Sequence, residues 1–214
     1  MCYNQSVSWT AFIIGTIINV ILIVLFMDNW MIVALALFFQ FVVTVQLFEA
    51  LSWRGQKELG ANGILVLTLC QPIFLGMILL FVSEVDPPLK LISGFILFLY
   101  IMWVIYSLNN ISNFTSLEKG VCNHLDYSFW KDMGSIPYFI VALLIAAILI
   151  KPASLAITFI VALFITLGLA MVFYNCKDET ASLWCLTSVL VPIVILIYAL
   201  IEKQMLKKED FSDL

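Results

Sequence analysis

Charged residues are scarce in this chain, and their scarcity argues against a soluble domain. Only 11% of the 214 residues are charged, whereas 64% are hydrophobic. A helix at the surface of a soluble protein carries a polar stripe, and segments such as Ile136–Ile150 and Leu190–Ile201 have none. No basic stripe is present, so nucleic acid is not expected as a partner. Membrane lipids are the expected surroundings.

The sequence also lacks the motifs of several classes of membrane protein. The seventh apolar stretch has no lysine at its centre, which leaves retinal without an attachment point. No H-E-x-x-H or G-x-S-x-G motif supports an intramembrane hydrolase. No TVGYG-like filter and no arginine-rich helix indicates a potassium pore or a voltage sensor. No cofactor is therefore predicted, a metal excepted, and an enzyme is less favoured than a non-enzyme.

Long apolar stretches fill nearly all of the chain. A helix needs about twenty apolar residues to cross a hydrocarbon core of roughly 30 Å. Seven such segments are predicted at Trp9–Met27, Trp30–Leu51, Ala61–Val82, Leu89–Leu108, Ile136–Ile150, Pro152–Tyr174 and Ser182–Ile201. The sequence therefore predicts an all-α integral membrane bundle of seven transmembrane helices. It forms one domain over residues 1–214, with a short tail at 203–214. The first helix has no basic segment before it and is expected to insert uncleaved.

The orientation in the membrane depends on two features, because lysine and arginine divide equally between the two sides. The basic cluster Lys203, Lys207 and Lys208 follows the last helix directly, as expected of a cytoplasmic flank. Three N-x-S/T sequons begin at Asn4, Asn110 and Asn113, all on the opposite side. These features favour an extracellular or lumenal N-terminus and a cytoplasmic C-terminus.

Glu49 is the first candidate site residue, because a carboxylate is costly inside a membrane. Gln46 and Glu49 are three residues apart and Trp53 lies one turn further on, so one helix face carries all three side chains. Burial favours the neutral form of a carboxyl group, which suits a proton carrier or a hydrogen-bond donor. The alternative is that Glu49 lies at the membrane interface and pairs with Arg54 or with the backbone.

Gln71 and Pro72 mark a second candidate position, in the third helix. Proline lacks an N–H group and frees a carbonyl one turn earlier, so a kink is expected there. Gln71 is predicted to bond across to the face of Gln46 and Glu49. A purely structural role is equally compatible, because interhelical amide bonds hold membrane bundles together. Asn19 and Gln40 are interpreted as such packing residues; Gln40 faces away from Glu49.

Cysteine and histidine form a third group, in connectors on the N-terminal side. Cys122 and His124 have the spacing C-x-H, which is a weak metal signal because no C-x-x-C pair or second histidine accompanies it. A disulfide between Cys122 and Cys176 is the alternative in an oxidising compartment, and free thiols are another.

Small residues recur every fourth position in the sixth predicted helix, at Ser154, Thr158, Ala162, Thr166 and Ala170. Such a ridge allows close approach of a neighbouring helix, including one from a second copy of the chain. The sequence therefore offers this face for homo-oligomer formation.

Four short motifs in order resemble a family. They are Met1-Cys2-Tyr3-Asn4, Gln46-Leu47-x-Glu49-x-x-x-Trp53, Gln71-Pro72 and Cys122-Asn123-His124-Leu125. The chain resembles an uncharacterised group of small multi-helix membrane proteins from large DNA viruses and their algal or protist hosts. The resemblance implies no activity. It does imply that Cys2, Gln46, Glu49, Trp53, Gln71 and His124 belong to one site.

These patterns leave three functions open. The first is a small channel or transporter for protons, cations or small solutes, with a polar cavity around Glu49. The second is a structural or interaction protein in which a Glu–Gln–His network stabilises the bundle. The third is a metal or redox enzyme that uses Cys2, Cys122 and His124.

Overall fold

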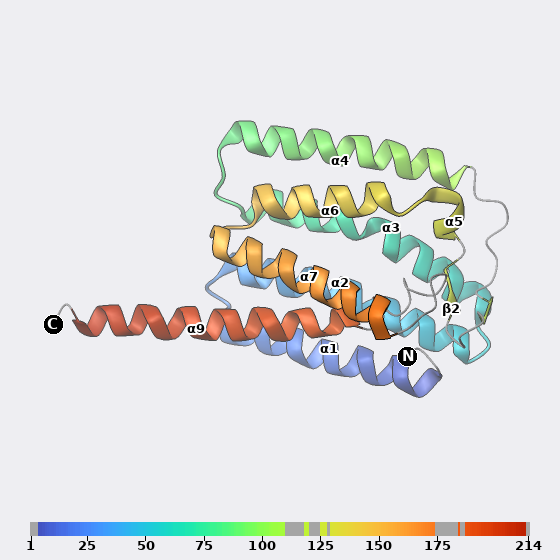
Figure 1. Ribbon diagram of the computed structural model, residues 1–214, viewed down its shortest axis with the longest axis horizontal. Helices are drawn as coiled ribbons and strands as arrows, with labels where there is room; N and C mark the ends of the chain where they lie inside the picture. Colours follow the sequence, from blue (N-terminus) through green and yellow to red (C-terminus); the bar gives the residue numbers. More distant parts are fainter. Residues whose placement is uncertain are drawn as a thin grey trace.

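The computed structural model of the protein describes residues 4–109, 118–119, 125–127, 129–173, 184 and 187–212. Seven apolar helices dominate these segments and form the predicted all-α bundle (Figure 1). They are α1 (Gln5–Leu25), α2 (Trp30–Trp53), α3 (Lys57–Val82), α4 (Pro87–Leu108), α6 (Ile136–Leu149), α7 (Ala153–Phe173) and α9 (Val191–Ser212). The shorter elements are β1 (Glu118–Lys119), β2 (Leu125–Asp126), α5 (Phe129–Met133) and the 3₁₀ helix η2 (Ser188–Leu190).

Six helices of the described segments are long and apolar enough to cross a membrane, which corrects the predicted count of seven spans. The exception is α6, whose 14 residues rise only about 21 Å, well below a hydrocarbon core of roughly 30 Å. Gly134, in the left-handed region at φ 74°, precedes α6, and the Lys151–Pro152 corner follows it. These two breaks leave no room for a longer helix.

Successive helices run in alternating directions, so the chain begins and ends at opposite ends of the bundle (Figure 1). The α6 helix takes part in this alternation despite its length. The two ends are called the N-terminal end and the C-terminal end of the bundle. The orientation of the two termini in the membrane remains a prediction.

A side-chain cap places the start of the first helix earlier than the hydropathy pattern does. The Asn4 side chain accepts a hydrogen bond from the Val7 N–H at 3.0 Å, so α1 begins at Gln5 rather than Trp9. Asn29 caps α2 in the same way, through the Ile32 N–H at 3.2 Å. At the other terminus α9 continues to Ser212, and Figure 1 shows it projecting beyond the other helices. The predicted tail is therefore helical over most of its length.

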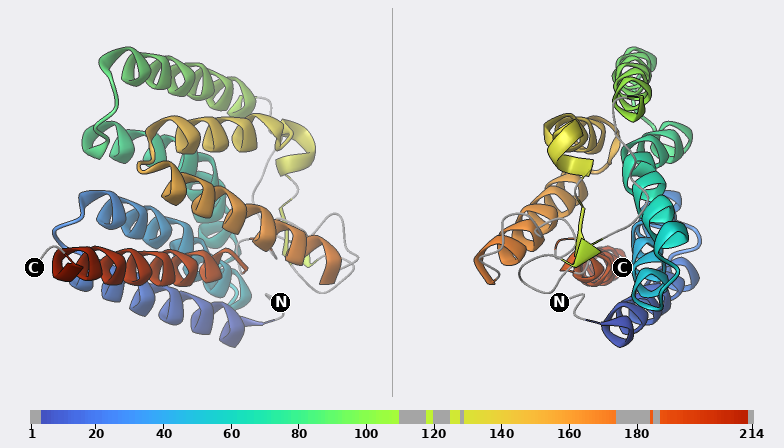
Figure 2. Two further views of the ribbon diagram at one scale, coloured as in Figure 1. Left: turned by 60° about the vertical axis from the view of Figure 1, so that its left-hand side comes forward. Right: turned by 90° about the vertical axis from the view of Figure 1, so that its right-hand side faces the viewer.

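The α2 helix is the centre of the bundle, while α1 and α4 lie at its edges (Figure 2). It packs most extensively against α3 and α1. Its contact with α1 includes the predicted polar packing residues: Gln40 accepts from the Asn19 amide at 3.3 Å and donates to the Thr16 hydroxyl at 3.1 Å. This confirms the interpretation of Asn19 and Gln40.

Two glycines allow α2 and α3 to approach closely. A Cβ atom on Gly60 would lie 1.9 Å from the Ser52 hydroxyl oxygen and 2.8 Å from the Phe48 carbonyl oxygen. One on Gly63 would lie 2.0 Å from the Phe48 ring. No side chain fits at either position unless the neighbours move. The crossing of the helices that carry Glu49 and Gln71 thus depends on glycine.

The small-residue ridge of α7 is used within the chain. Ala162, Thr166 and Ala170 are buried in the monomer. At one end of the ridge the Ser154 and Tyr198 hydroxyls lie 2.7 Å apart, joining α7 to α9. The ridge therefore packs against α9 over part of its length, and homo-oligomer formation through it stays a prediction.

Candidate functional site: a buried carboxyl group and two tyrosine hydroxyls

Glu49 lies in the last two turns of α2 and is completely buried. Tyr127 is only 2% exposed, and its hydroxyl donates a hydrogen bond to Glu49 Oε1. The expectation that Glu49 points inward is confirmed, and the interfacial alternative, which concerns its depth in the membrane, stays open. Glu49 is the only buried carboxyl group among the side chains that the structure describes.

Tyr127 follows strand β2 directly and lies between β2 and α5 in the chain. Strand β2 pairs antiparallel with β1, with Glu118 opposite Asp126 and Lys119 opposite Leu125. Leu125 and Phe129 on either side of Tyr127 are buried. The Tyr127 ring stacks on Phe129, with centroids 5.8 Å apart. Apolar anchoring on both sides thus holds the hydroxyl at the carboxyl group.

Gln71 forms a second polar pair, deeper in the bundle. The Tyr138 hydroxyl from α6 donates to Gln71 Oε1, and both side chains are buried. The Gln71 Nε2 group has no hydrogen-bond partner among the described residues. Gln71 was predicted to bond toward α2, whereas the partner observed lies on α6.

A third tyrosine contact lies in the turn of α3 before Pro72. Because proline lacks an N–H, the carbonyl that it frees in this turn is that of Thr68, one residue before Leu69. The Tyr100 hydroxyl from α4 donates to the Leu69 carbonyl in that turn, at 3.1 Å. Helix α3 changes direction along its length in Figure 2, as expected for a helix with an internal proline.

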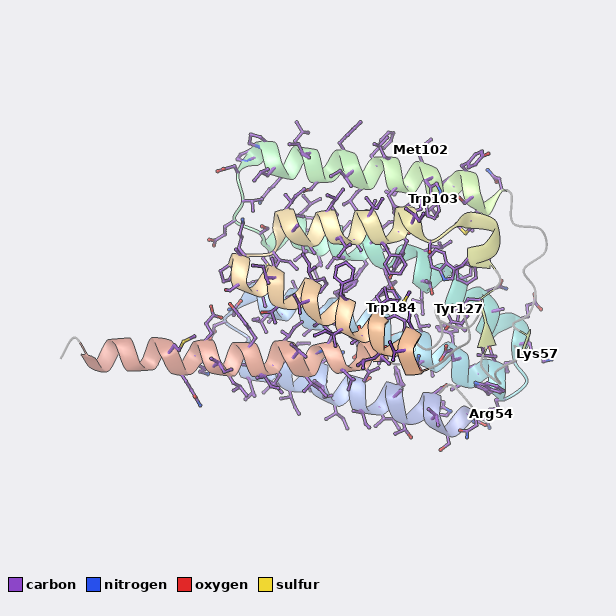
Figure 3. The ribbon with its side chains drawn as sticks, in the orientation of Figure 1. Arg54, Lys57, Met102, Trp103, Tyr127 and Trp184 are labelled. Atoms are coloured by element: carbon purple, nitrogen blue, oxygen red, sulfur yellow. The ribbon has the colours of Figure 1, made fainter. Side chains whose placement is uncertain are left out.

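A series of aromatic rings connects the two hydroxyl pairs. Neighbouring ring centroids lie 5.0 Å apart for Phe129–Trp130, 5.4 Å for Trp130–Tyr138 and 6.2 Å for Tyr138–Trp184. In Figure 3, Tyr127 and Trp184 lie among the helices, in the half of the bundle that has Arg54 and Lys57 at its end. The space between the polar pairs is therefore packed with aromatic side chains.

A small cavity adjoins the inner pair. It measures about 30 Å³, enough for one or two water molecules. Its polar lining comes from Gln71, Tyr138 and Ser188. The apolar lining includes Phe38, Phe39, Phe159 and Trp184. The Gln71 amide thus borders space for a water-sized hydrogen-bond partner.

The other predicted site residues divide into two groups. Gln46 is completely buried one turn from Glu49, while Trp53 is half-buried and its indole Nε1 has no partner among the described residues. Cys2, Cys122, His124 and Cys176 lie outside the described residues, so the disulfide and the C-x-H metal site stay predictions. Within the described segments, no three His, Cys, Asp or Glu side chains are placed to hold a metal ion.

Sequence reasoning did not assign Tyr127 and Tyr138 to the site. The available signal was slight: Tyr127 lies three residues after His124, inside the motif region, and Tyr138 begins an apolar helix. Neither position shows a polar residue forced into an apolar segment, which is the signal that identified Glu49 and Gln71.

Comparison with known proteins found no matching family, no matching curated protein and no matching solved structure. The functional argument therefore depends on the geometry of the site.

Proposed function

We propose that the protein is a polytopic membrane transport protein in which Glu49 binds and releases a proton. Complete burial of Glu49 inside an apolar bundle is the observation that supports this role most strongly. Ionisable groups within membrane segments are costly and typically mark ion or proton pathways. The Tyr127 hydroxyl donates to Glu49 Oε1, and a donor at this position stabilises the carboxylate form.

The size of the cavity at Gln71 favours a proton over the small solutes that the sequence left open. The space at Gln71 holds one or two water molecules and is too small for an organic substrate. Water bonded to the Gln71 amide would extend the hydrogen-bonded groups toward the middle of the bundle.

The position of the polar groups favours a carrier over an open pore. Glu49 and Tyr127 lie toward the N-terminal end, and Gln71 is 14 residues into α3, about 21 Å along that helix. Between Gln71 and the C-terminal end, α3 and α4 offer two buried polar side chains. They are Ser83, directly after α3, and Ser93 in α4. Proton release at that end would require a second conformation, as in alternating access.

The test is proton flux into proteoliposomes under an imposed pH gradient, followed with an internal pH-sensitive dye. Glu49→Gln keeps the size of the side chain and removes the titrating group, so flux should fall to that of protein-free vesicles. Glu58→Gln is the matched control, because Glu58 is exposed at the same end of the bundle. Equal flux through both variants would show that Glu49 takes no part in proton transport.

A structural protein is the second candidate, supported by the continuous aromatic packing between the two hydroxyl pairs. If wild-type protein carries no flux and Glu49→Gln changes only thermal stability, this candidate replaces transport. The metal or redox function relies on Cys2, Cys122 and His124, and it remains a prediction together with the viral or algal resemblance and the orientation in the membrane.

A further inference from the structure

An apolar groove of about 340 Å³ runs between α7 and α9. Its walls are Ile157, Val161, Ile165 and Leu169 on α7, with Leu190 in η2 and Val194 at the start of α9. Ala162 and the threonines Thr158 and Thr166 complete the lining. Val161 and Ile165 are exposed, so the groove opens to the surroundings of the bundle.

Both threonine hydroxyls in the groove already have partners. Thr158 donates to the Ser154 carbonyl at 2.8 Å, and Thr166 donates to the Leu163 carbonyl at 2.9 Å. The Thr166 oxygen also accepts from the Trp184 indole at 3.2 Å. The occupant therefore needs no polar group in this part of the groove, and a hydrocarbon chain fits its chemistry.

Polar groups gather at one end of the same groove. Ser154 precedes Thr158 by one turn and Tyr198 follows Val194 by one turn, so their bonded hydroxyls continue the two walls. Lys151 is exposed at the corner directly before α7. This corner lies at the C-terminal end of the bundle, where the spanning helices turn back (Figure 1). The hydroxyl that accepts in the Ser154–Tyr198 pair keeps its own O–H free to donate, and together with the Lys151 ammonium group it suits a phosphate headgroup.

The length of the groove agrees with one leaflet. Ile157 and Leu169 are 12 residues apart, which is about 18 Å along α7. Half of a hydrocarbon core of roughly 30 Å is about 15 Å. We infer that this groove binds one phospholipid, with an acyl chain along α7 and α9 and the phosphate at Lys151, Ser154 and Tyr198. A second copy of the chain, suggested by the small-residue ridge, is the competing occupant.

Filling the groove from its rim tests the inference without disturbing the buried α7–α9 contact. The protein is reconstituted in mixed phosphatidylcholine and phosphatidylglycerol vesicles, extracted in mild detergent and examined by native mass spectrometry. Wild-type protein should retain one phospholipid, and Val161→Trp should lose it. Val20→Trp is the matched control, because Val20 on α1 is 52% exposed and Val161 is 48% exposed. It should retain the lipid.

Two further variants keep the test decisive. Val194→Trp fills the groove from the α9 wall and should also lose the lipid, and Lys151→Gln should lower retention of phosphatidylglycerol about fivefold. Equal retention in Val161→Trp and Val20→Trp would overturn the inference. So would a lipid-free wild-type dimer that dissociates only when the groove is filled. Neither experiment measures proton flux. Failure of this inference therefore leaves the proposed function untouched, and failure of the proposed function leaves this inference untouched.

Discussion

Replacing Gly60 with leucine is expected to prevent α2 and α3 from packing as they do in the wild-type bundle. The first added carbon would lie 1.9 Å from the Ser52 hydroxyl oxygen and 2.8 Å from the Phe48 carbonyl oxygen. Because one of these atoms belongs to the backbone, rotation of a side chain cannot relieve the overlap. We expect a loss of about 3 kcal/mol or more in unfolding free energy, measured in mixed detergent micelles.

Gly94→Leu is the control for this substitution. Gly94 lies inside α4, and a Cβ atom there would meet nothing within 4 Å. The change from glycine to leucine gains the same helix propensity at both positions, up to about 1 kcal/mol. A stability change of equal size and sign in the two variants would show that close approach at Gly60 is not required.

Replacing Tyr127 with phenylalanine is expected to weaken the site more than the same change at Tyr138. Both tyrosines are nearly fully buried and both donate through the hydroxyl. The acceptor of Tyr127 is a carboxyl group, whereas the acceptor of Tyr138 is the neutral amide of Gln71. Hydrogen bonds to charged groups contribute about 1.5–3 kcal/mol and neutral ones about 0.5–1.5 kcal/mol. We therefore expect about 2 kcal/mol and about 1 kcal/mol of lost stability, respectively.

The same two variants should differ in the pH dependence of proton flux. Loss of the Tyr127 hydroxyl removes a donor from the carboxylate, so the flux of Tyr127→Phe should require a different external pH for half-maximal rate. Tyr138→Phe keeps the Glu49 pair and should leave that pH unchanged. Identical pH profiles for both variants and the wild-type protein would show that Tyr127 does not affect proton binding.

The helices were predictable because the membrane sets a length and a composition that the chain must meet. The starts of α2 and α6 and the ends of α3 and α4 agree with the predicted positions. Helices α1 and α3 begin four residues before their predicted starts, at Gln5 and Lys57. Polar residues at these starts reduce the hydropathy of the segment, but they still form helix. The shortness of α6 was already visible in the predicted segment Ile136–Ile150, which lies between Gly134 and Pro152.

The polar site was predictable in part. Glu49 and Gln71 are polar groups within apolar segments, and the cost of exposing them to lipid requires that they face inward. Their partners were not predictable in this way. Tyr127 reaches Glu49 from 78 residues away, through a connector that hydropathy and helical periodicity describe only as polar chain.

Protonation of Glu49 can be measured directly by infrared difference spectroscopy of the reconstituted protein after a step in pH. The account predicts a carboxylic acid C=O band that gains intensity as pH falls, in the wild-type protein and in Glu58→Gln. The part of the band that belongs to Glu49 should be missing from Glu49→Gln, whereas the exposed carboxyl groups contribute to all three proteins. An unchanged band in Glu49→Gln would show that another carboxyl group takes up the proton, and would contradict the proposed role of Glu49.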